Sequence, residues 1–256
     1  MCTATWWHQP GGYTLFFNRD ELKRRAQAQP PQRFEAHGVA FLAPTDPDGG
    51  GTWLAVNAHG LTLALVNHYP TVETAEPDTE PRSRGLLVRD LAHLGHTLDT
   101  ADQLARSGHA GLRRYAPFHL LALGPDQPTV QATWDGRELT RRHGRAVAQP
   151  LTGSSFDSQR IVTCRQTAFA DSFGDAEATL MDDNRHRRFH RQHDAAQGAA
   201  SVLMERPDAR TVSYAEVEVT PREVILHYAD RRDRAPAFDP ASVHRLSRVV
   251  AVTALP

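Results

Sequence analysis

The chain has 256 residues, and 40% of them are hydrophobic, which is typical of a globular protein that needs neither a metal nor a disulfide for stability. The 29 Lys and Arg residues and 30 Asp and Glu residues give a formal net charge of -1 and are spread along the chain, which disfavours binding to nucleic acid or to an anionic membrane. No stretch approaches the roughly 18 consecutive apolar residues of a membrane helix, and the N-terminus does not resemble a signal peptide, so we expect a cytoplasmic protein with residues 1–256 in a single domain.

Short runs of Thr and apolar residues predict β-strands in the first quarter of the chain. Residues 2–8 and 12–18 are separated by the turn-forming Gln9-Pro10-Gly11, and together they predict a hairpin. Three more strands are expected at 39–43, 52–57 and 61–66.

Helical signals follow in the middle of the chain. Ser83 can cap a helix whose leucines have helical spacing and which ends at Gly95. A second helix is expected around 100–107, with strands at 118–123 and 129–134.

The last third of the chain returns from helix to strands. Residues 158–173 place apolar side chains on one stripe and predict a helix, and strands are expected near 200–205, 210–219 and 222–229. The polar stretches 70–82 and 231–240 are expected to be surface loops. This order predicts an α+β fold in which helices pack on largely antiparallel sheets.

Cys2 is the residue with the most distinctive chemistry. Initiator methionine is normally trimmed before a small second residue, so we expect the mature chain to begin with Cys2. Its thiol and α-amine have ordinary pKa values of about 8.5 and about 7.7–8.0, so the neutral amine can take the thiol proton. A cysteine at this position also occurs by chance, and a purely structural role stays open. In a reducing cytosol we expect Cys2 and Cys164 to be free thiols.

The tetrapeptide Asn18-Arg19-Asp20-Glu21 ends the second strand of the predicted hairpin, which returns the chain close to Cys2. A cationic Arg19 would stabilise the thiolate, and Asp20 could orient the α-amine by an ionic hydrogen bond. The alternative is a solvated, charged exit from the hairpin.

The segments MCTATWW, FFNRDEL and GGGTWLAVNAHGLTLALVNHYP closely resemble the NRDE family, whose animal members are called transport and Golgi organisation protein 2. The resemblance continues through Ser83-Arg84-Gly85 and more loosely through 151–157 and 201–213. That family is similar to the cysteine N-terminal-nucleophile hydrolases, including penicillin V acylases and bile salt hydrolases. These enzymes are αββα sandwiches of two mainly antiparallel sheets and cleave non-peptide amide bonds.

The resemblance implies roles for particular residues. Cys2 would be the nucleophile, Arg19 and Asp20 would position and tune it, and Asn67 would donate a hydrogen bond to the oxyanion. The ligand would be a small-molecule amide, and the implied substrate-binding residues are Asn18, Trp53, Ser154, Ser155 and Arg165.

One position departs from the acylase pattern. The acylases carry a second asparagine in a Leu-Thr-Asn-Ser segment, whereas this chain has Leu151-Thr152-Gly153-Ser154-Ser155. Ser154, Ser155 or a backbone N–H near Gly153 would have to replace the missing amide, which puts amidase activity in doubt.

Two further motifs have the spacing of ligand sites, but their neighbouring residues do not suit the usual ligands. The run Gly49-Gly50-Gly51 lacks the lysine and the helix of a phosphate loop, so we expect a turn at the pocket rim with Trp53 beneath it. His186, His190 and His193 have helical spacing, but the surrounding arginines disfavour a metal, so we expect a solvated basic face suited to an anion.

Three classes of function remain open. The chain is a C–N amide hydrolase, a non-catalytic carrier or chaperone for haem or another hydrophobic ligand such as a lipid, or a scaffold for partners. The resemblance to the NRDE family implies the carrier class. No covalent haem-attachment motif is present, and His8, His59 and His68 would be the haem ligands to test. We expect no metal, and no cofactor other than haem in the carrier class, and the sequence does not indicate an oligomeric state.

Overall fold

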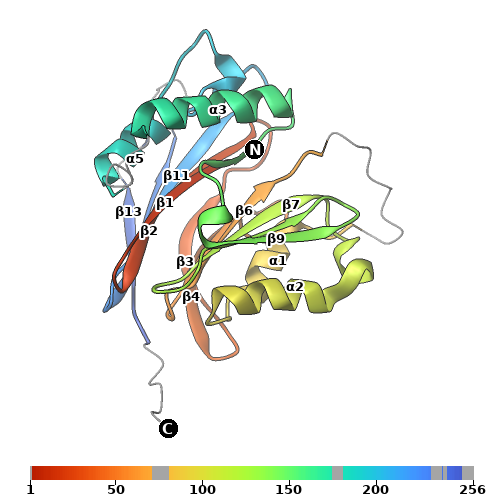
Figure 1. Ribbon diagram of the computed structural model, residues 1–256, viewed down its shortest axis with the longest axis vertical. Helices are drawn as coiled ribbons and strands as arrows, with labels where there is room; N and C mark the ends of the chain where they lie inside the picture. The colour runs from red at the N-terminus through yellow and green to blue at the C-terminus, as the bar shows by residue number, and fades with distance from the viewer. Residues whose placement is uncertain (1, 71–80, 175–180, 232–237, 239–240, 250–256) are drawn as a thin grey trace.

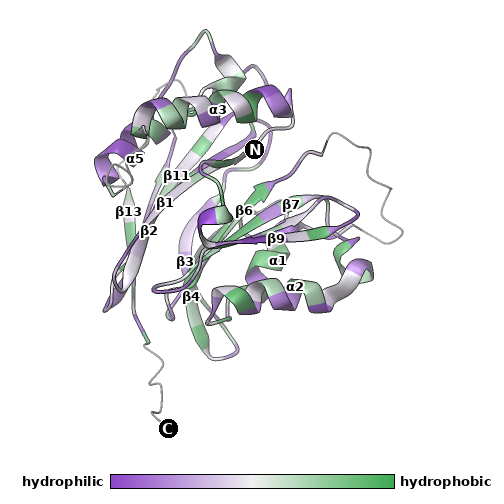
Figure 2. Cartoon of the chain, viewed as in Figure 1, coloured by the Kyte–Doolittle hydropathy of each residue, from purple (hydrophilic) through white to green (hydrophobic). Residues whose placement is uncertain are grey.

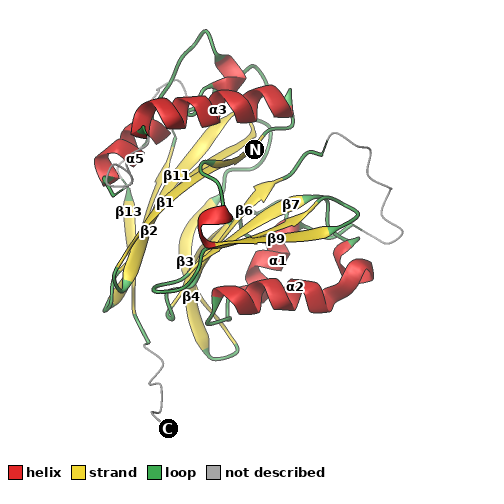
Figure 3. Ribbon diagram, in the orientation of Figure 1, coloured by secondary structure: helices red, strands yellow, loops and turns green. Residues whose placement is uncertain are grey.

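The computed structural model describes residues 2–70, 81–174, 181–231, 238 and 241–249. Two β-sheets pack face to face, and helices cover the outer face of each (Figures 1 and 3). All strand pairs of the described residues are antiparallel. The predicted α+β class and the αββα arrangement are therefore confirmed.

The first sheet has six strands in the order β10-β1-β2-β11-β12-β13. Their bounds are β1 Cys2–Gln9, β2 Gly12–Leu22, β10 Leu151–Gly153, β11 Ala209–Val219, β12 Glu223–Asp230 and β13 Ser242–Ser247. The predicted hairpin is formed by β1 and β2, in a register that pairs Gln9 with Gly12 and Cys2 with Arg19. Because β10 pairs with the other side of β1, Cys2 starts a strand that is held on both sides.

The second sheet has seven strands in sequential order from β3 to β9. Their bounds are β3 Gln29–Ala36, β4 Val39–Thr45, β5 Leu54–Asn57, β6 Thr62–Asn67, β7 Phe118–Leu123, β8 Val130–Trp134 and β9 Leu139–His143. At the end of the sandwich where β1 begins, β6 lies against both β1 and β10. The start of the chain is thereby placed where the two sheets meet.

Helices α1 (Arg84–Leu91) and α2 (Thr97–Leu112) cover the second sheet, and α3 (Ser158–Phe173) and α5 (Asp183–His190) cover the first (Figure 1). Ser83 precedes α1 as predicted, although its hydroxyl makes no capping hydrogen bond. Gly108 has a positive φ of 62° and interrupts the regular helix of α2, directly after the predicted end at residue 107.

Apolar side chains fill three interfaces. The largest cluster lies between the sheets and includes Cys2, Trp6, Phe17 and Trp53. A second cluster joins the other face of the second sheet to α1 and α2. The third joins α3, α5 and residue 202 through a group of phenylalanines. Burial of these faces from water is the main force that holds the layers together.

One predicted strand is wrong, and four observed strands were not predicted. Residues 201–205 form a largely buried irregular segment instead of a strand, and Val202 packs against the phenylalanines of α3 and α5. Its apolar character reflects that packing and not strand pairing. The unpredicted strands are β3, β9, β10 and β13, which are the four edge strands of the two sheets. The expected loops at 70–82 and 231–240 lie for the most part outside the described residues.

No helix in the described part of the chain has the length and apolar character required to cross a membrane.

Candidate functional site

Cys2 lies at the start of β1, opposite Arg19 on one neighbouring strand and Gly153 on the other. Residues that pair directly across antiparallel strands project from the same face of a sheet. Cys2 and Arg19 therefore both face the second sheet, and they are 6% and 5% exposed.

Five of the residues selected from the sequence line one pocket, with a cavity volume of about 460 Å³. They are Cys2, Arg19, Asp20, Trp53 and Asn67. This volume is within the range of small-molecule sites. Three separate segments, the β1–β2 hairpin, the residue that precedes β5 and the end of β6, thus meet at the thiol.

Arg19 is held in place by an aromatic ring and two carboxylates. Its guanidinium carbon lies 4.0 Å from the centroid of the Trp53 ring. The same guanidinium is 3.5 Å from the Glu21 carboxylate and 3.9 Å from that of Asp46. A buried cation held between fixed partners supplies a local positive potential beside the thiol.

Two opposing effects act on the thiol. Burial raises the pKa of Cys2, and the nearby Asp20 carboxylate acts in the same direction, whereas a hydrogen bond from the Asp20 backbone N–H and the charge of Arg19 lower it. Burial is the largest of these, so the thiol is held protonated at neutral pH. A base is needed to activate it.

Asp20 points to the other face of the sheet. Its carboxylate accepts hydrogen bonds from Arg165 on α3 at 3.0 Å and from Thr211 on β11 at 2.6 Å. Arg165 is fully buried and also donates to the hydroxyls of Thr3 and Thr152. Arg165 therefore holds Asp20 and the strands around Cys2 through hydrogen bonds on the helix-covered face of the sheet. It is not among the residues that line the pocket.

Asn67 ends β6, and its amide nitrogen lies 3.3 Å from the Tyr69 hydroxyl, to which it donates. Gly153 packs directly on the backbone of this residue. A Cβ at position 153 would lie 2.2 Å from the Asn67 carbonyl oxygen, closer than real contacts allow. The missing amide of the acylase pattern is thus explained, because β10 and β6 approach too closely for any side chain at 153.

The remaining predicted binding residues lie away from the pocket. The Ser154 hydroxyl closes a turn with the backbone of Phe156, and Ser155 lines a separate surface pocket. Asn18 is buried on the helix-covered face, where its amide donates to the carbonyls of His190 and Val202. These contacts are structural and reach no part of the Cys2 pocket.

The glycine run packs against the start of α1. A Cβ at Gly51 would lie 2.2 Å from the carbonyl carbon of Gly85, and the Thr52 N–H donates to the Gly85 carbonyl at 3.0 Å. This close approach places the first residues of α1 at the pocket, together with Gly49 and Trp53. The run is therefore a turn at the pocket rim.

Several charged pocket residues were not selected from the sequence. Arg25 pairs with Asp46 through two hydrogen bonds of 3.2 and 2.5 Å, and Arg82 pairs with Asp90 at 2.8 Å. Arg84 donates to the Pro117 carbonyl at 2.8 Å, and burial lowers its pKa. Among these residues, only Arg84 had a signal in the sequence, which was the match to the NRDE family through Ser83-Arg84-Gly85.

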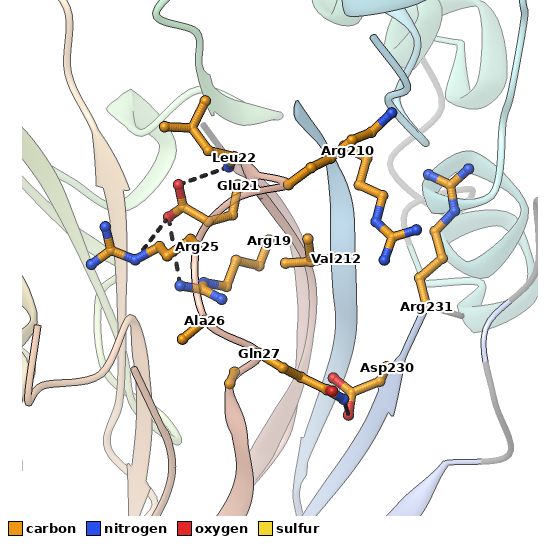
Figure 4. A pocket seen from close by; sticks show the side chains of 12 residues that line it. Arg19, Glu21, Leu22, Arg25, Ala26, Gln27, Arg210, Val212, Asp230 and Arg231 are labelled. Carbon is orange, nitrogen blue, oxygen red and sulfur yellow. Dashed lines mark hydrogen bonds and ion pairs between the residues drawn. The ribbon is translucent and has the colours of Figure 1, made fainter. Parts of the chain in front are cut away.

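Figure 4 shows a second pocket, of about 400 Å³, which shares lining residues with the first. Arg19, Glu21 and Arg25 line both pockets, and their ion pairs form the wall between them. The far side of the second pocket carries Arg210 and Arg231.

The histidines of α5 do not form a solvated basic face. The helix is largely hydrophilic (Figure 2), yet His186 and His190 are fully buried and both hydrogen-bond the Thr5 hydroxyl, at 2.7 and 2.9 Å. Burial holds the pKa of His190 well below its ordinary value, so the ring is neutral. The neighbouring Arg187 is paired with Glu216. The expected solvated basic face is therefore wrong for His186 and His190, whereas His193 is exposed beyond the end of α5, with its Nδ1 3.0 Å from the Leu203 carbonyl.

The three histidines considered for haem do not line the Cys2 pocket either. His8 contacts the Thr129 hydroxyl at 2.8 Å, and the His68 ring lies beside that of His119, tilted by 45° with ring centroids 4.3 Å apart. His59 lies beside the Val249 carbonyl, with its Nδ1 3.4 Å from that oxygen. None of the three lines the Cys2 pocket.

Comparison with solved structures identifies the fold as that of the N-terminal-nucleophile hydrolases. Penicillin V acylase from Agrobacterium tumefaciens is 14% identical, with a TM-score of 0.55 over 96% of this chain and 86% of that chain. The C2A mutant of conjugated bile acid hydrolase from Clostridium perfringens is 12% identical, with a TM-score of 0.54 over 96% and 92%. The Caenorhabditis elegans orthologue of N-acylethanolamine-hydrolysing acid amidase is 10% identical, with a TM-score of 0.59 over 84% and 92%.

A search of curated protein sequences found no match. A family model, Transport and Golgi organisation 2, matches residues 1–153. These residues are more than half of the 256 and include every segment that forms the Cys2 pocket. The chain therefore belongs to the Transport and Golgi organisation 2 family.

Proposed function

We propose that the chain is a cysteine N-terminal-nucleophile amidohydrolase that cleaves the C–N bond of a small-molecule, non-peptide amide. The observation that carries the proposal is the position of Cys2, whose thiol shares a pocket with Arg19 and Asn67 at the start of a strand held on both sides. The three structural neighbours, an acylase, a bile acid hydrolase and an acid amidase, support the same chemistry.

The mechanism requires removal of Met1, which frees the α-amine of Cys2. The neutral amine takes the thiol proton, which is needed because burial raises the pKa of the thiol. The sulfur then attacks the amide carbon, and the side-chain amide of Asn67 donates to the oxyanion that forms. The proton passes to the leaving amine as the C–N bond breaks, which leaves a thioester on Cys2.

Water completes the cycle. The α-amine takes a proton from the water that attacks the thioester, the acid product leaves, and the sulfur recovers its proton. Arg19 stabilises the thiolate that forms in each half-reaction, and Asp20 supports Cys2 through its backbone N–H while Arg165 holds its carboxylate. Asn67 supplies one hydrogen-bond donor to the oxyanion. Because position 153 carries no side chain, the second donor to the oxyanion must be a backbone N–H group.

The test begins with intact mass, which reports whether Met1 is removed. Purified chain is then incubated with a panel of small acyl amides, and released amine is measured with fluorescamine. Cys2→Ala should abolish turnover, and Cys164→Ala, which changes the other cysteine, should leave it unchanged. A thioester adduct on Cys2 under acid quench would support the mechanism, and equal turnover by wild type and Cys2→Ala would reject it.

The carrier alternative lacks a supporting contact in the described residues. The three candidate histidines do not line the Cys2 pocket, and the pocket carries several charged groups instead of an apolar surface.

A further inference from the structure

The charges of the Cys2 pocket can be matched to one another pair by pair. Arg25 is bound to Asp46, Arg82 to Asp90, and Arg19 lies between Glu21 and Asp46. The carboxylate of Asp20 is bound to Arg165 beneath the sheet. After these pairs are formed, Arg84 is the pocket arginine that has no carboxylate within salt-bridge distance in the described part of the chain.

The surroundings of Arg84 make this unusual. Its one hydrogen bond in the described residues goes to the neutral carbonyl of Pro117, and burial lowers its pKa. Tyr69, Cys2 and Glu21 act on this guanidinium electrostatically, but no carboxylate of the described residues forms an ion pair with it, and a largely buried cation without an ion pair is costly to maintain. A bound anion would offset that cost.

The backbone next to Arg84 favours an anion at the same place. Ser83, Arg84 and Gly85 all line the pocket, and they are the residues at which α1 begins. The first turn of α1 contains no acidic residue, and the Ser83 hydroxyl makes no capping hydrogen bond. The positive end of the helix dipole thus adds to the charge of Arg84.

We infer that Arg84, together with the first turn of α1, binds a carboxylate of the ligand in the Cys2 pocket, and that the substrate is therefore a small amide that also bears a carboxylate. That this ligand is a substrate rests on the proposed function. That it carries a negative charge is inferred from the pocket residues alone. The pocket volume of about 460 Å³ suits an amide of the size of a short N-acyl amino acid. Arg84 and Cys2 line the same pocket, so the carboxylate and the scissile bond would be near one another.

The experiment measures binding separately from turnover. N-acetylglycine and N-acetylglycinamide differ only in the carboxylate, and each is titrated calorimetrically into the full-length Cys2→Ala chain. This variant has no thiol at position 2, so a change in affinity on substitution of Arg84 reports the contact of Arg84 with the ligand and not an effect on the thiol. We expect the acid to bind at least about tenfold more tightly than the amide, as one hydrogen bond to a charged group predicts.

Arg84→Gln in the same background should bring the two affinities together, and Arg84→Lys should retain part of the difference. Arg106→Gln is the matched control, since Arg106 is exposed on α2 and contacts Gln103. Equal binding of acid and amide by the Cys2→Ala chain, or absence of binding of both at millimolar concentration, would overturn the inference whether or not Arg84→Gln folds. A preference for the acid without any amidase activity in the wild type would instead reject the proposed function and leave the carboxylate site in place.

Discussion

Cys2 and Arg19 are directly paired residues of β1 and β2, so their side chains share the face of the first sheet that looks toward the second. This pairing makes the electrostatic influence of Arg19 on the thiol a consequence of strand register. A shift of one residue would move Arg19 to the helix-covered face.

The first prediction concerns the reactivity of the thiol. Burial raises the pKa of Cys2 and Arg19 opposes the rise, so alkylation should increase with pH at values above the ordinary thiol range, and Arg19→Gln should move the profile still higher. The rate of iodoacetamide labelling in a Cys164→Ala background measures this. Arg106→Gln serves as the control, and a profile at or below the ordinary range would contradict the prediction.

The second prediction concerns the buried pair of Asp20 and Arg165, both fully excluded from solvent. Arg165→Met leaves the Asp20 carboxylate buried without its cation, so unfolding free energy should fall by about 3–5 kcal/mol. Urea denaturation measures the change. Arg160→Met on the exposed side of α3 should have little effect, because Arg160 is 69% exposed. A loss at Arg165 no larger than that at Arg160 would show that the pair contributes no stability.

The third prediction concerns the contact between Gly153 and the backbone of Asn67. Gly153→Ala should destabilise the chain by about 1–3 kcal/mol and lower any amidase activity, because the added methyl must push β10 and β6 apart. Gly95→Ala is a matched control, since its Cβ would make only ordinary contacts at 3.7 Å or more. Turnover by Gly153→Asn equal to or above that of the wild type would contradict the prediction, because the site would then tolerate the residue that the acylases carry.

The fourth prediction concerns acid stability. Burial lowers the pKa of His119 to about 3, so the folded chain keeps this ring neutral where an unfolded chain, with an ordinary value of about 6.5, takes up a proton. The unfolded state then binds more protons, and stability falls as pH drops from about 6.5 toward 3, by about 1.4 kcal/mol per pH unit for one histidine. His119→Gln should flatten this slope in urea titrations between pH 6.5 and 4. The exposed His143→Gln should not, and a slope unaltered by His119→Gln would contradict the assignment.

The strands that sequence patterns predicted are those buried within the sheets. Each of the four missed strands lies at a sheet edge, where one side of the strand is unpaired and polar residues are tolerated. β9, with the sequence LTRRH, and β3, with two prolines near its start, lack the apolar alternation on which strand prediction depends. Edge position is a property of the assembled sheet, so it cannot be recognised from these segments alone.

The site could be predicted as far as the residues that approach Cys2, but not the direction in which each side chain points. Arg19 and Asp20 are consecutive in the sequence and therefore project from opposite faces of β2. The sequence placed both beside the thiol, whereas the carboxylate of Asp20 faces Arg165 on α3. Likewise, His186 and His190 lie in a strongly polar helix, and only the packing of that helix on Thr5 and Phe16 buries them.

The wall between the two adjoining pockets consists of the ion-paired side chains of Arg19, Glu21 and Arg25. Side chains can change rotamer while the sheets stay fixed, so the length of ligand that fits beside Cys2 is not set by the backbone. Arg19 is 5% exposed and held against Trp53, whereas Glu21 and Arg25 are 23% and 32% exposed, so the latter two are the side chains whose movement would change the width of the wall. Salt screens the partly exposed pair of Arg25 and Glu21 more than it screens the buried Arg19, so salt concentration would act on ligand size selection as well as on affinity.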